Sequence, residues 1–229
     1  MENHQNVSDS LIQTIAIDGP VASGKSTVGQ IVAQNLRFQY LDTGVMYRAV
    51  AWLTYFSKID LNNHSIIEKH ITENPIQLLN NMGTQVQIGN TVLESELRSP
   101  LIEQSVSDVS KISIVRELLV KQQRDIANQS DGIVMVGRDI GSVVLTNADL
   151  KIYLDASIEK RAQRRILDRI KMGSPTTLPD MMEEIRKRDF IDTNRENSPL
   201  TATDDAIIID TDSLDQTAVA NLIVRYATT

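Results

Sequence analysis

The sequence predicts an α/β fold with a parallel central sheet, an inserted small antiparallel β subdomain and a helical lid. Four apolar segments of strand type, "TIAID", "IVMVG", "LKIYLDA" and "AIIIDT", are separated by helical patterns, as in a parallel sheet covered by helices. Residues 84–94 instead alternate apolar and polar side chains, which indicates a hairpin. Two arginine-rich helical segments flank a break at Gly173, Pro175 and Pro179, so they can swing over a site as a lid.

The first strand segment leads directly into "GPVASGKST", residues 19–27, and apolar residues at helical spacing follow from Val28 to Leu36. This strand, loop and helix order is the one that a phosphate-binding loop (P-loop) requires, so the fold is predicted to be a three-layer P-loop fold. Lys25 would reach the β- and γ-phosphates of a nucleoside triphosphate, and the Ser26 hydroxyl would bind Mg²⁺. The alternative is a glycine-rich turn with a surface lysine, which the combined context disfavours.

The remaining elements follow in order. "LDTG" comes after a second short strand and before a helix through "AVAWLTYF". The hairpin at 84–94 has Gly89-Asn90 at its centre. We therefore predict a division into 1–59 (core with the P-loop), 60–105 (insertion) and 106–229 (core including a lid at about 157–195), with an edge hairpin as the alternative to an insertion. A long helix is expected from about Ile102 or Ser105 to Asn128.

Composition limits the function classes. The chain of 229 residues has no cysteine, which excludes disulfides, thiolate zinc sites and a cysteine nucleophile. The net charge of −7 argues against nucleic-acid or anionic-membrane partners, so an anionic ligand must be met by locally clustered arginines. The first ten residues are polar and no apolar run approaches membrane-spanning length. A cytoplasmic monomer is the expectation.

Charged and polar residues follow two predicted strands. Asp42, Thr43 and Arg48 come after the second strand, and Arg138 and Asp139 come after "GIVMV". Because the carboxyl ends of parallel strands line the ligand crevice, these residues are expected beside the P-loop. The alternatives are a helix cap for Asp42 and Thr43 and a solvent-exposed ion pair for Arg138 and Asp139. The base-reading motif Asn/Thr-Lys-x-Asp of a guanine-specific switch does not occur in the chain.

Two further arginine clusters lie at helical spacing, in "EKRAQRRILDRI" and "RKRDFIDTNR". Their members are Arg161, Arg164 and Arg165 in the first segment and Arg188, Asp192 and Arg195 in the second. Each set shares one helix face. A solvated face with weak ion pairs is the alternative for either cluster alone, but beside a P-loop such arginines can neutralise a transferring phosphoryl group.

With these motifs in place, the sequence resembles the bacterial-type cytidylate (CMP) kinases of the nucleoside monophosphate kinase group, from about residue 12 to the C-terminus. The resemblance is carried by the P-loop together with "LDTGVMYR", "GRDIG" and "RDFIDTNR", and by the long insertion. It departs at "SVVLTNADLK", where an aromatic residue and a proline are usual. The resemblance implies transfer of the γ-phosphoryl group of ATP to CMP, and also to dCMP, with Mg²⁺.

The resemblance also implies residue roles. Residues expected to hold ATP are Gly19, Pro20, Val21, Ala22, Ser23, Gly24, Lys25, Ser26 and Thr27 of the P-loop, with Ser26 on the metal and Arg161, Arg164 and Arg165 in the lid. Residues expected at CMP are Thr43, Arg48, Ser107, Arg116, Asp139, Arg188, Asp192 and Arg195. Lys25, Arg138 and Arg188 are expected to be catalytic.

Chemistry agrees with this assignment. Cytosine presents an amino donor beside two acceptors, and Asp139 with Arg116 and Ser107 supplies a matching set. The attacking CMP phosphate is already anionic, so no general base is needed. Two alternatives remain open: a kinase for a non-nucleotide acceptor such as a sugar or shikimate, and a nucleotide-binding module without turnover.

Overall fold

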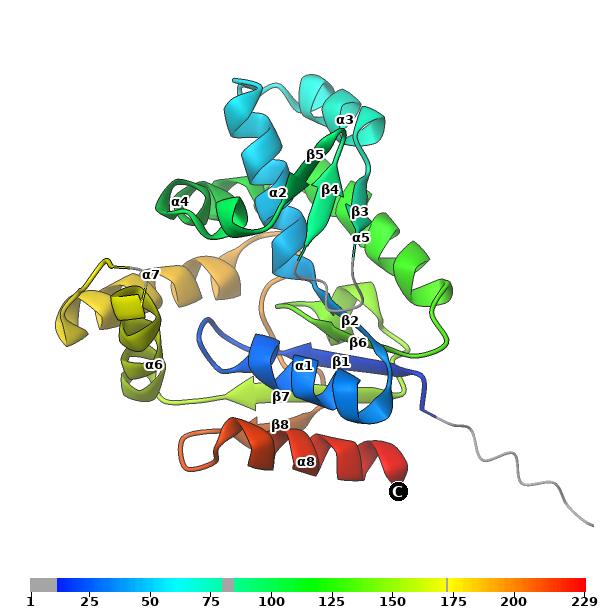
Figure 1. Cartoon of the computed structure of the whole chain (residues 1–229), viewed down its shortest axis with the longest axis vertical. Coiled ribbons are helices and arrows are strands. Elements are labelled where there is room, and N and C mark those ends of the chain that lie inside the picture. Colours follow the sequence, from blue (N-terminus) through cyan, green and yellow to red (C-terminus); the bar gives the residue numbers. More distant parts are fainter. Residues whose placement is uncertain (1–11, 80–84, 172) are drawn as a thin grey trace, which may run out of the picture.

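The central sheet of the protein is parallel and has five strands in the order β2-β6-β1-β7-β8 (Figure 1). The computed structural model describes residues 12–79, 85–171 and 173–229. The strands are β1 (Thr14–Asp18), β2 (Gln39–Asp42), β6 (Ile133–Val136), β7 (Leu150–Asp155) and β8 (Ile207–Asp210). Every neighbouring pair is parallel. The predicted α/β fold with a parallel sheet is confirmed.

Helices bury both faces of this sheet. Ile15 and Ile17 point into a core shared with α1 (Lys25–Leu36) and α8 (Gln216–Thr228). Ala16 between them points into a second core shared with α2 (Thr43–Phe56) and α5 (Ser113–Asn128). Successive strand residues face opposite sides, so an uninterrupted apolar run is what a strand buried on both faces requires. Three layers result.

The insertion contains a second, antiparallel sheet of three strands, in the order β3-β4-β5. These strands are β3 (Ile76–Leu78), β4 (Val86–Ile88) and β5 (Thr91–Leu93), and α3 (His64–Glu73) precedes them. Gly89 turns the chain between β4 and β5 at φ +57°, a conformation that glycine adopts without strain. The predicted hairpin and small antiparallel subdomain are confirmed; Thr84, at the start of the expected hairpin, lies outside the described residues. The domain boundaries remain a prediction.

The single long helix expected up to Asn128 is wrong. Two helices occupy this stretch, α4 (Pro100–Val109) and α5 (Ser113–Asn128), after the short η1 (Ser95–Arg98). The chain leaves the helical conformation at Ile112, which is extended at φ −74° and ψ 117°. This break leaves the carbonyl of Ser110 free of the helix, and the carbonyl accepts a hydrogen bond from Arg116 instead.

The lid is a helical hairpin of α6 (Ile158–Lys171) and α7 (Leu178–Asn194), which projects beside the sheet in Figure 1. Its own core is small and consists of Ala162, Met181 and Ile185. The Thr177 side chain caps α7 by accepting from the Asp180 N–H. The predicted helical lid is thus confirmed. No helix in the part of the chain that the structure describes is long and apolar enough to span a membrane.

Candidate active site

The P-loop joins β1 to the N-terminus of α1, as the sequence predicts. Gly19 has φ +147°, and a Cβ there would lie 2.2 Å from the Leu154 carbonyl oxygen, so only glycine fits. Lys25 is the first residue of α1 and is 6% exposed. Its Nζ donates to the Pro20 carbonyl at 2.6 Å and to Ser23 Oγ at 3.2 Å. The lysine therefore curls back over the loop, where a phosphate group would replace these two acceptors.

Lys25 lies in an environment that disfavours its charge. Burial, followed by the nearby positive charge of Arg138, lowers the pKa of Lys25 well below its usual value, while Asp42 and Asp18 act in the opposite direction. A phosphate beside Nζ would reverse this balance, because an opposite charge at short range favours the charged amine. The site is therefore short of negative charge at the position where the P-loop would hold a phosphate chain.

At the end of β2, the Asp42 side chain links the P-loop to α2. Ser26 Oγ donates to Asp42 Oδ2 at 2.8 Å, and Asp42 Oδ1 accepts from the Gly44 N–H at 3.0 Å. Asp42 is thus the helix cap that the alternative interpretation named, and it also faces the loop. The Thr43 hydroxyl donates to the Val136 carbonyl at 3.0 Å, which ties α2 to β6.

Mg²⁺ binds oxygen ligands such as a hydroxyl and a carboxylate, and water and substrate phosphates complete its coordination. Ser26 and Asp42 therefore fit the metal that the sequence implies. Among the described residues, no group of three or more His, Cys, Asp or Glu side chains lies close enough together to hold a metal ion. Water and substrate phosphates would therefore have to supply the other ligands.

Asp18, which the sequence analysis did not single out, holds the loop after β6 against the P-loop. Its carboxylate is 5% exposed and accepts from the N–H groups of Ile140 and Gly141, both at 2.8 Å. Burial raises the pKa of Asp18 to about 6, against the lowering effect of these two hydrogen bonds. Its position at the carboxyl end of β1, one residue before the P-loop, was the available signal.

Asp139 lies in a buried cluster of charges. Its carboxylate contacts Arg116 Nη2 directly and Arg195 Nη2 at 3.5 Å, with all three side chains at most 6% exposed. The Arg116 guanidinium lies 5.4 Å from the centre of the Tyr47 ring, in cation–π range. Asp139 therefore forms buried ion pairs, and Arg138 forms a partly buried one with Asp192, so the solvent-exposed alternative for Arg138 and Asp139 is wrong. Ser107 is not in this cluster, since its hydroxyl contacts Arg188.

Asp192 joins the next two arginines. Its Oδ2 accepts from Arg138 Nε at 2.8 Å and from Arg188 Nε at 3.4 Å. Burial opposes ionisation, but Arg138 and then Arg188 outweigh it and hold the pKa of Asp192 below its usual value. Its buried Oδ1 has no hydrogen-bond partner among the described residues.

The spacing suggested that Arg195 shares a helix face with Arg188 and Asp192, and this expectation is wrong. Helix α7 ends at Asn194, and Arg195 is extended at φ −66° and ψ 140°. Its Nε donates to the Ser198 carbonyl at 2.5 Å. This turn brings Arg195 to Asp139, so the arginine still belongs to the buried charge cluster. Arg48 of α2, by contrast, has no hydrogen-bond partner within the described part of the chain, and it lines a small pocket with Ser26 and Asp42.

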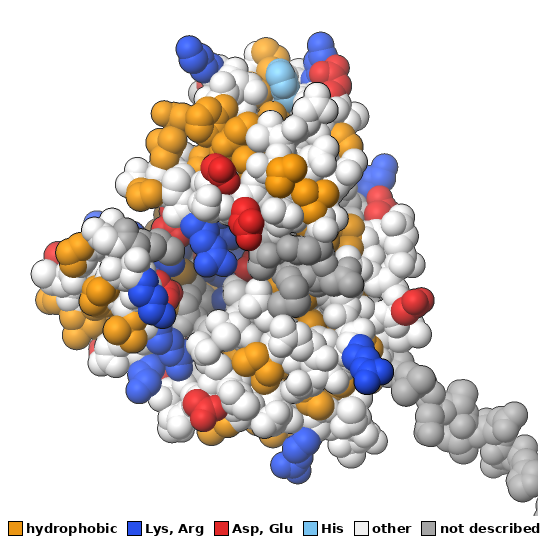
Figure 2. All heavy atoms as spheres, viewed as in Figure 1, with side chains coloured by type: hydrophobic (Ala, Val, Ile, Leu, Met, Phe, Trp, Pro, Cys, Tyr) orange, Lys and Arg blue, Asp and Glu red, His pale blue; other side chains and the backbone are white. Residues whose placement is uncertain are grey.

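The lid arginines divide into two groups. Arg161 Nη1 donates to the Val21 carbonyl at 3.2 Å, and Arg164 Nη1 donates to the Ser23 carbonyl at 3.4 Å, so both contact the P-loop. Arg164 also donates to Thr211 after β8, a contact for which the sequence carried no signal. Arg165 turns away and contacts Glu103 of α4. Figure 2 shows basic side chains along the edge of the lid that faces the core.

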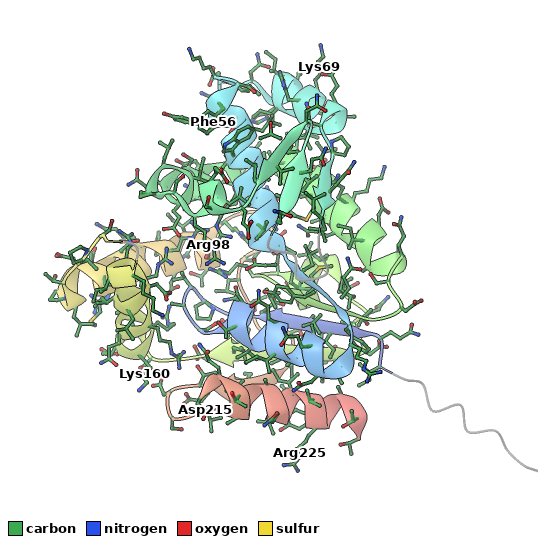
Figure 3. All side chains as sticks on the ribbon, in the orientation of Figure 1. Phe56, Lys69, Arg98, Lys160, Asp215 and Arg225 are labelled. Carbon is green, nitrogen blue, oxygen red and sulfur yellow. The ribbon has the colours of Figure 1, made fainter. Side chains whose placement is uncertain are left out.

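The arrangement brings together a P-loop lysine, a hydroxyl–carboxylate pair suited to a divalent cation and a series of arginines, of which Arg116 and Arg195 have buried side chains. Figure 3 shows Arg98, at the end of η1, pointing from the insertion toward the same region. Such a site can bind two groups of anions that face each other and can neutralise charge that passes between them.

Comparisons with known proteins agree with this chemistry. A family model described as cytidylate kinase matches residues 15–229. A cytidylate kinase from Streptococcus suis (strain 05ZYH33) is 44% identical over 215 residues, covering 93% of this chain and 95% of the relative. One from Bacillus licheniformis is 43% identical over 213 residues, covering 92% and 94%.

Among solved structures, an uncharacterized protein from Eubacterium ventriosum ATCC 27560 shares the fold, with a TM-score of 0.51 at 13% identity over 94% of this chain and 98% of that one. The family match runs from β1 and the P-loop through the residues after β2 and β6 and the lid to the last helix. The chain therefore belongs to the cytidylate kinase family, a family of nucleotide-binding kinases.

Proposed function

We propose that this protein transfers the γ-phosphoryl group of ATP to CMP, and also to dCMP, giving CDP or dCDP and ADP. One observation carries the proposal: the adjacent residues Arg138 and Asp139 lie between two halves of the site. Arg138 is near enough to Lys25 of the P-loop to lower its pKa, and Asp139 lies in the buried cluster with Arg116. One dipeptide thus connects the phosphate-transfer side with a side suited to reading a base.

The transfer is direct and in line. An anionic oxygen of the CMP phosphate attacks the γ-phosphorus of ATP, the bond from that phosphorus to the bridging oxygen breaks, and ADP leaves. Lys25, Arg138 and Arg188 neutralise the charge on the transferring group, and Arg48 holds the acceptor phosphate. Arg161 and Arg164 hold the lid over the P-loop and exclude water. No side chain needs to remove a proton from the acceptor.

Ser26 and Asp42 would hold Mg²⁺ together with the phosphates. When bound, the ion would reduce the negative charge of the phosphate groups. The Ser26 hydroxyl now donates to Asp42, and this contact keeps the two oxygens together beside the P-loop.

The base and sugar of CMP have candidate partners in the buried charge clusters. The Asp139 carboxylate would accept from the cytosine amino group, and Arg116 would donate to the cytosine acceptors. The unpartnered Asp192 Oδ1 would accept from a sugar hydroxyl. The 3′-hydroxyl, which dCMP keeps, suffices for this bond, which is why dCMP belongs in the proposal. Monomeric action in the cytoplasm and the boundaries 1–59, 60–105 and 106–229 also remain predictions.

A coupled assay of ADP release tests the function. We expect turnover that depends on added CMP or dCMP and on Mg²⁺, with UMP and AMP much poorer acceptors. Turnover with shikimate or gluconate but not with CMP would favour a non-nucleotide kinase. ATP binding without acceptor-dependent ADP release would identify a binding module and would contradict the proposal.

A further inference from the structure

Helix α4 packs into the core with one face and contacts the lid with another. Ile102 and Val106 are buried on one side, where the helix packs into the core that it shares with α2. Glu103 and Ser107 lie one turn apart and so occupy a common face. Both contact an arginine of the lid. The insertion therefore meets the lid through α4.

The contact of Glu103 is an ion pair with Arg165 of α6. Arg165 Nη2 donates to Oε1 at 2.7 Å and to Oε2 at 2.6 Å. The two side chains are only 22% and 20% exposed, for Arg165 and Glu103 respectively. A short, charge-assisted contact that is mostly shielded from water is stronger than a surface ion pair. It joins residues 62 positions apart in the chain.

The same turn of α6 also contacts the P-loop. Arg161 lies one turn before Arg165 and donates to the Val21 carbonyl. Arg164 directly precedes Arg165 and donates to the Ser23 carbonyl. One helical turn thus contacts the P-loop on one side and helix α4 on the other. Close by on α4, Ser107 contacts Arg188, an arginine expected at CMP and at the transferring group.

We propose that Glu103 is a positioning residue that couples occupation of the acceptor site to the position of the lid arginines over ATP. This inference rests on the proposed function. An acceptor held by Arg188 and the core fixes α4, and the Glu103–Arg165 pair then fixes the turn of α6 that carries Arg161 and Arg164. Two ligands that favour the same arrangement bind cooperatively, and each raises the affinity of the other by the same factor.

Calorimetry with a non-hydrolysable ATP analogue, with and without saturating CMP, tests the coupling. The parent should bind the analogue more tightly when CMP is present. Glu103→Gln removes the charge but keeps the side-chain length, and we expect it to reduce this CMP effect by about three- to ten-fold. Binding of the analogue alone should change much less, because the ion pair has no bound acceptor to couple to the lid. A role in folding alone would not produce this difference.

Glu184→Gln is the matched control. Glu184 accepts from Arg169 Nη2 at 2.8 and 3.1 Å, an ion pair of the same geometry that lies within the lid and is more exposed, so the control should keep the full CMP effect. Arg165→Gln should lower the CMP effect to the level of Glu103→Gln, and the double variant should lower it no further. A parent without cooperativity, or a Glu103→Gln variant that keeps it, overturns the inference while CMP turnover stands. A parent that binds no CMP overturns the proposed function as well.

Discussion

Asp139 is the residue on which acceptor choice depends. Uracil has a carbonyl where cytosine has its amino group, so the Asp139 carboxylate would face an oxygen if UMP were bound. A site built to accept from a donor can discriminate by up to ~10⁴–10⁵-fold against an analogue that lacks the donor, since the buried acceptor is left unpaired. We therefore expect a large preference of the parent for CMP over UMP in kcat/KM.

Asp139→Asn should narrow the CMP/UMP ratio by at least about ten-fold, because an amide can donate to the uracil oxygen. The amide also keeps the size of the side chain between Arg116 and Arg195. Asp192→Asn is the matched change at the proposed sugar contact and should weaken CMP and UMP alike. An unchanged ratio in Asp139→Asn would assign the carboxylate to holding the two arginines.

Asp18 makes stability depend on pH in an unusual direction. Its pKa rises from 3.8 to about 6 on folding, so between about pH 4 and 6 the folded protein binds more protons than the unfolded chain. The free energy of unfolding should therefore fall as pH rises through this window, by up to about 3 kcal/mol, and then level off. Most buried carboxyl groups with ion-pair partners act in the opposite sense.

Urea unfolding of the parent and Asp18→Asn from pH 4 to pH 8 isolates this effect. The stability of the parent relative to the variant should fall between pH 4 and 6; parallel curves would show that Asp18 titrates normally. Asp149→Asn is a control whose curve should run parallel to that of the parent over this pH range. Hydrogen bonds from Gln13 and Thr14 outweigh burial and lower the pKa of Asp149, so its contribution is lost as pH falls below the usual carboxyl range.

At the scale of elements, local sequence patterns predicted the strands and helices whose formation depends on residues adjacent in the chain. The apolar runs identified β1, β6 and β7 because strands buried on both faces need them; they also identified the edge strand β8, although its Ile208 is exposed. The same reasoning missed the break between α4 and α5. Ile112 fits a helical apolar pattern, but Arg116 bonds the Ser110 carbonyl across the break, and Arg116 is itself held by Asp139 from a distant part of the chain.

Side-chain partners far apart in the chain were the least predictable part of the site. The spacing placed three lid arginines on one face, but it could not show that Arg165 contacts Glu103 while Arg161 and Arg164 contact the P-loop. Asp18 was likewise invisible as a partner, because its donors lie 122 and 123 residues away. The P-loop itself was predictable, since its function depends on residues next to one another.

The division of the lid arginines leads to a prediction for α6. Replacing Arg161 and Arg164 with Ala removes both contacts to the P-loop carbonyls, and we expect kcat to fall by about 10²-fold or more because charge on the transferring group is less well neutralised. The ratio of ATP hydrolysis to transfer should rise as water enters. Arg169→Ala, on the same helix but paired with Glu184, should leave both quantities unchanged. Rates equal to those of the parent in the double variant would mean that the P-loop contacts do not serve catalysis.

At the scale of the whole molecule, the two sheets are separate, but one hydrophobic core contains residues of both. One core contains Ala16 and Leu41 of the central sheet together with Val86, Ile88 and Leu93 of the small sheet. The insertion therefore shares its core with one face of the central sheet. The lid has only the small cluster around Ala162, Met181 and Ile185. Since a unit that opens independently needs few buried apolar contacts with its surroundings, the lid should open on its own and the insertion should not.

Native-state hydrogen exchange can test this order of stability. Amides of α6 and α7 should exchange first, at a free energy well below that of global unfolding, while amides of β4 and α5 should exchange together with those of β1 and β6. An ATP analogue with CMP should slow exchange in the lid most, because Arg161, Arg164 and Arg188 would then contact bound phosphates and mass action favours the closed form. Exchange of β4 in a separate step from β1 would show instead that the insertion opens as a unit of its own, in line with the boundaries 60–105.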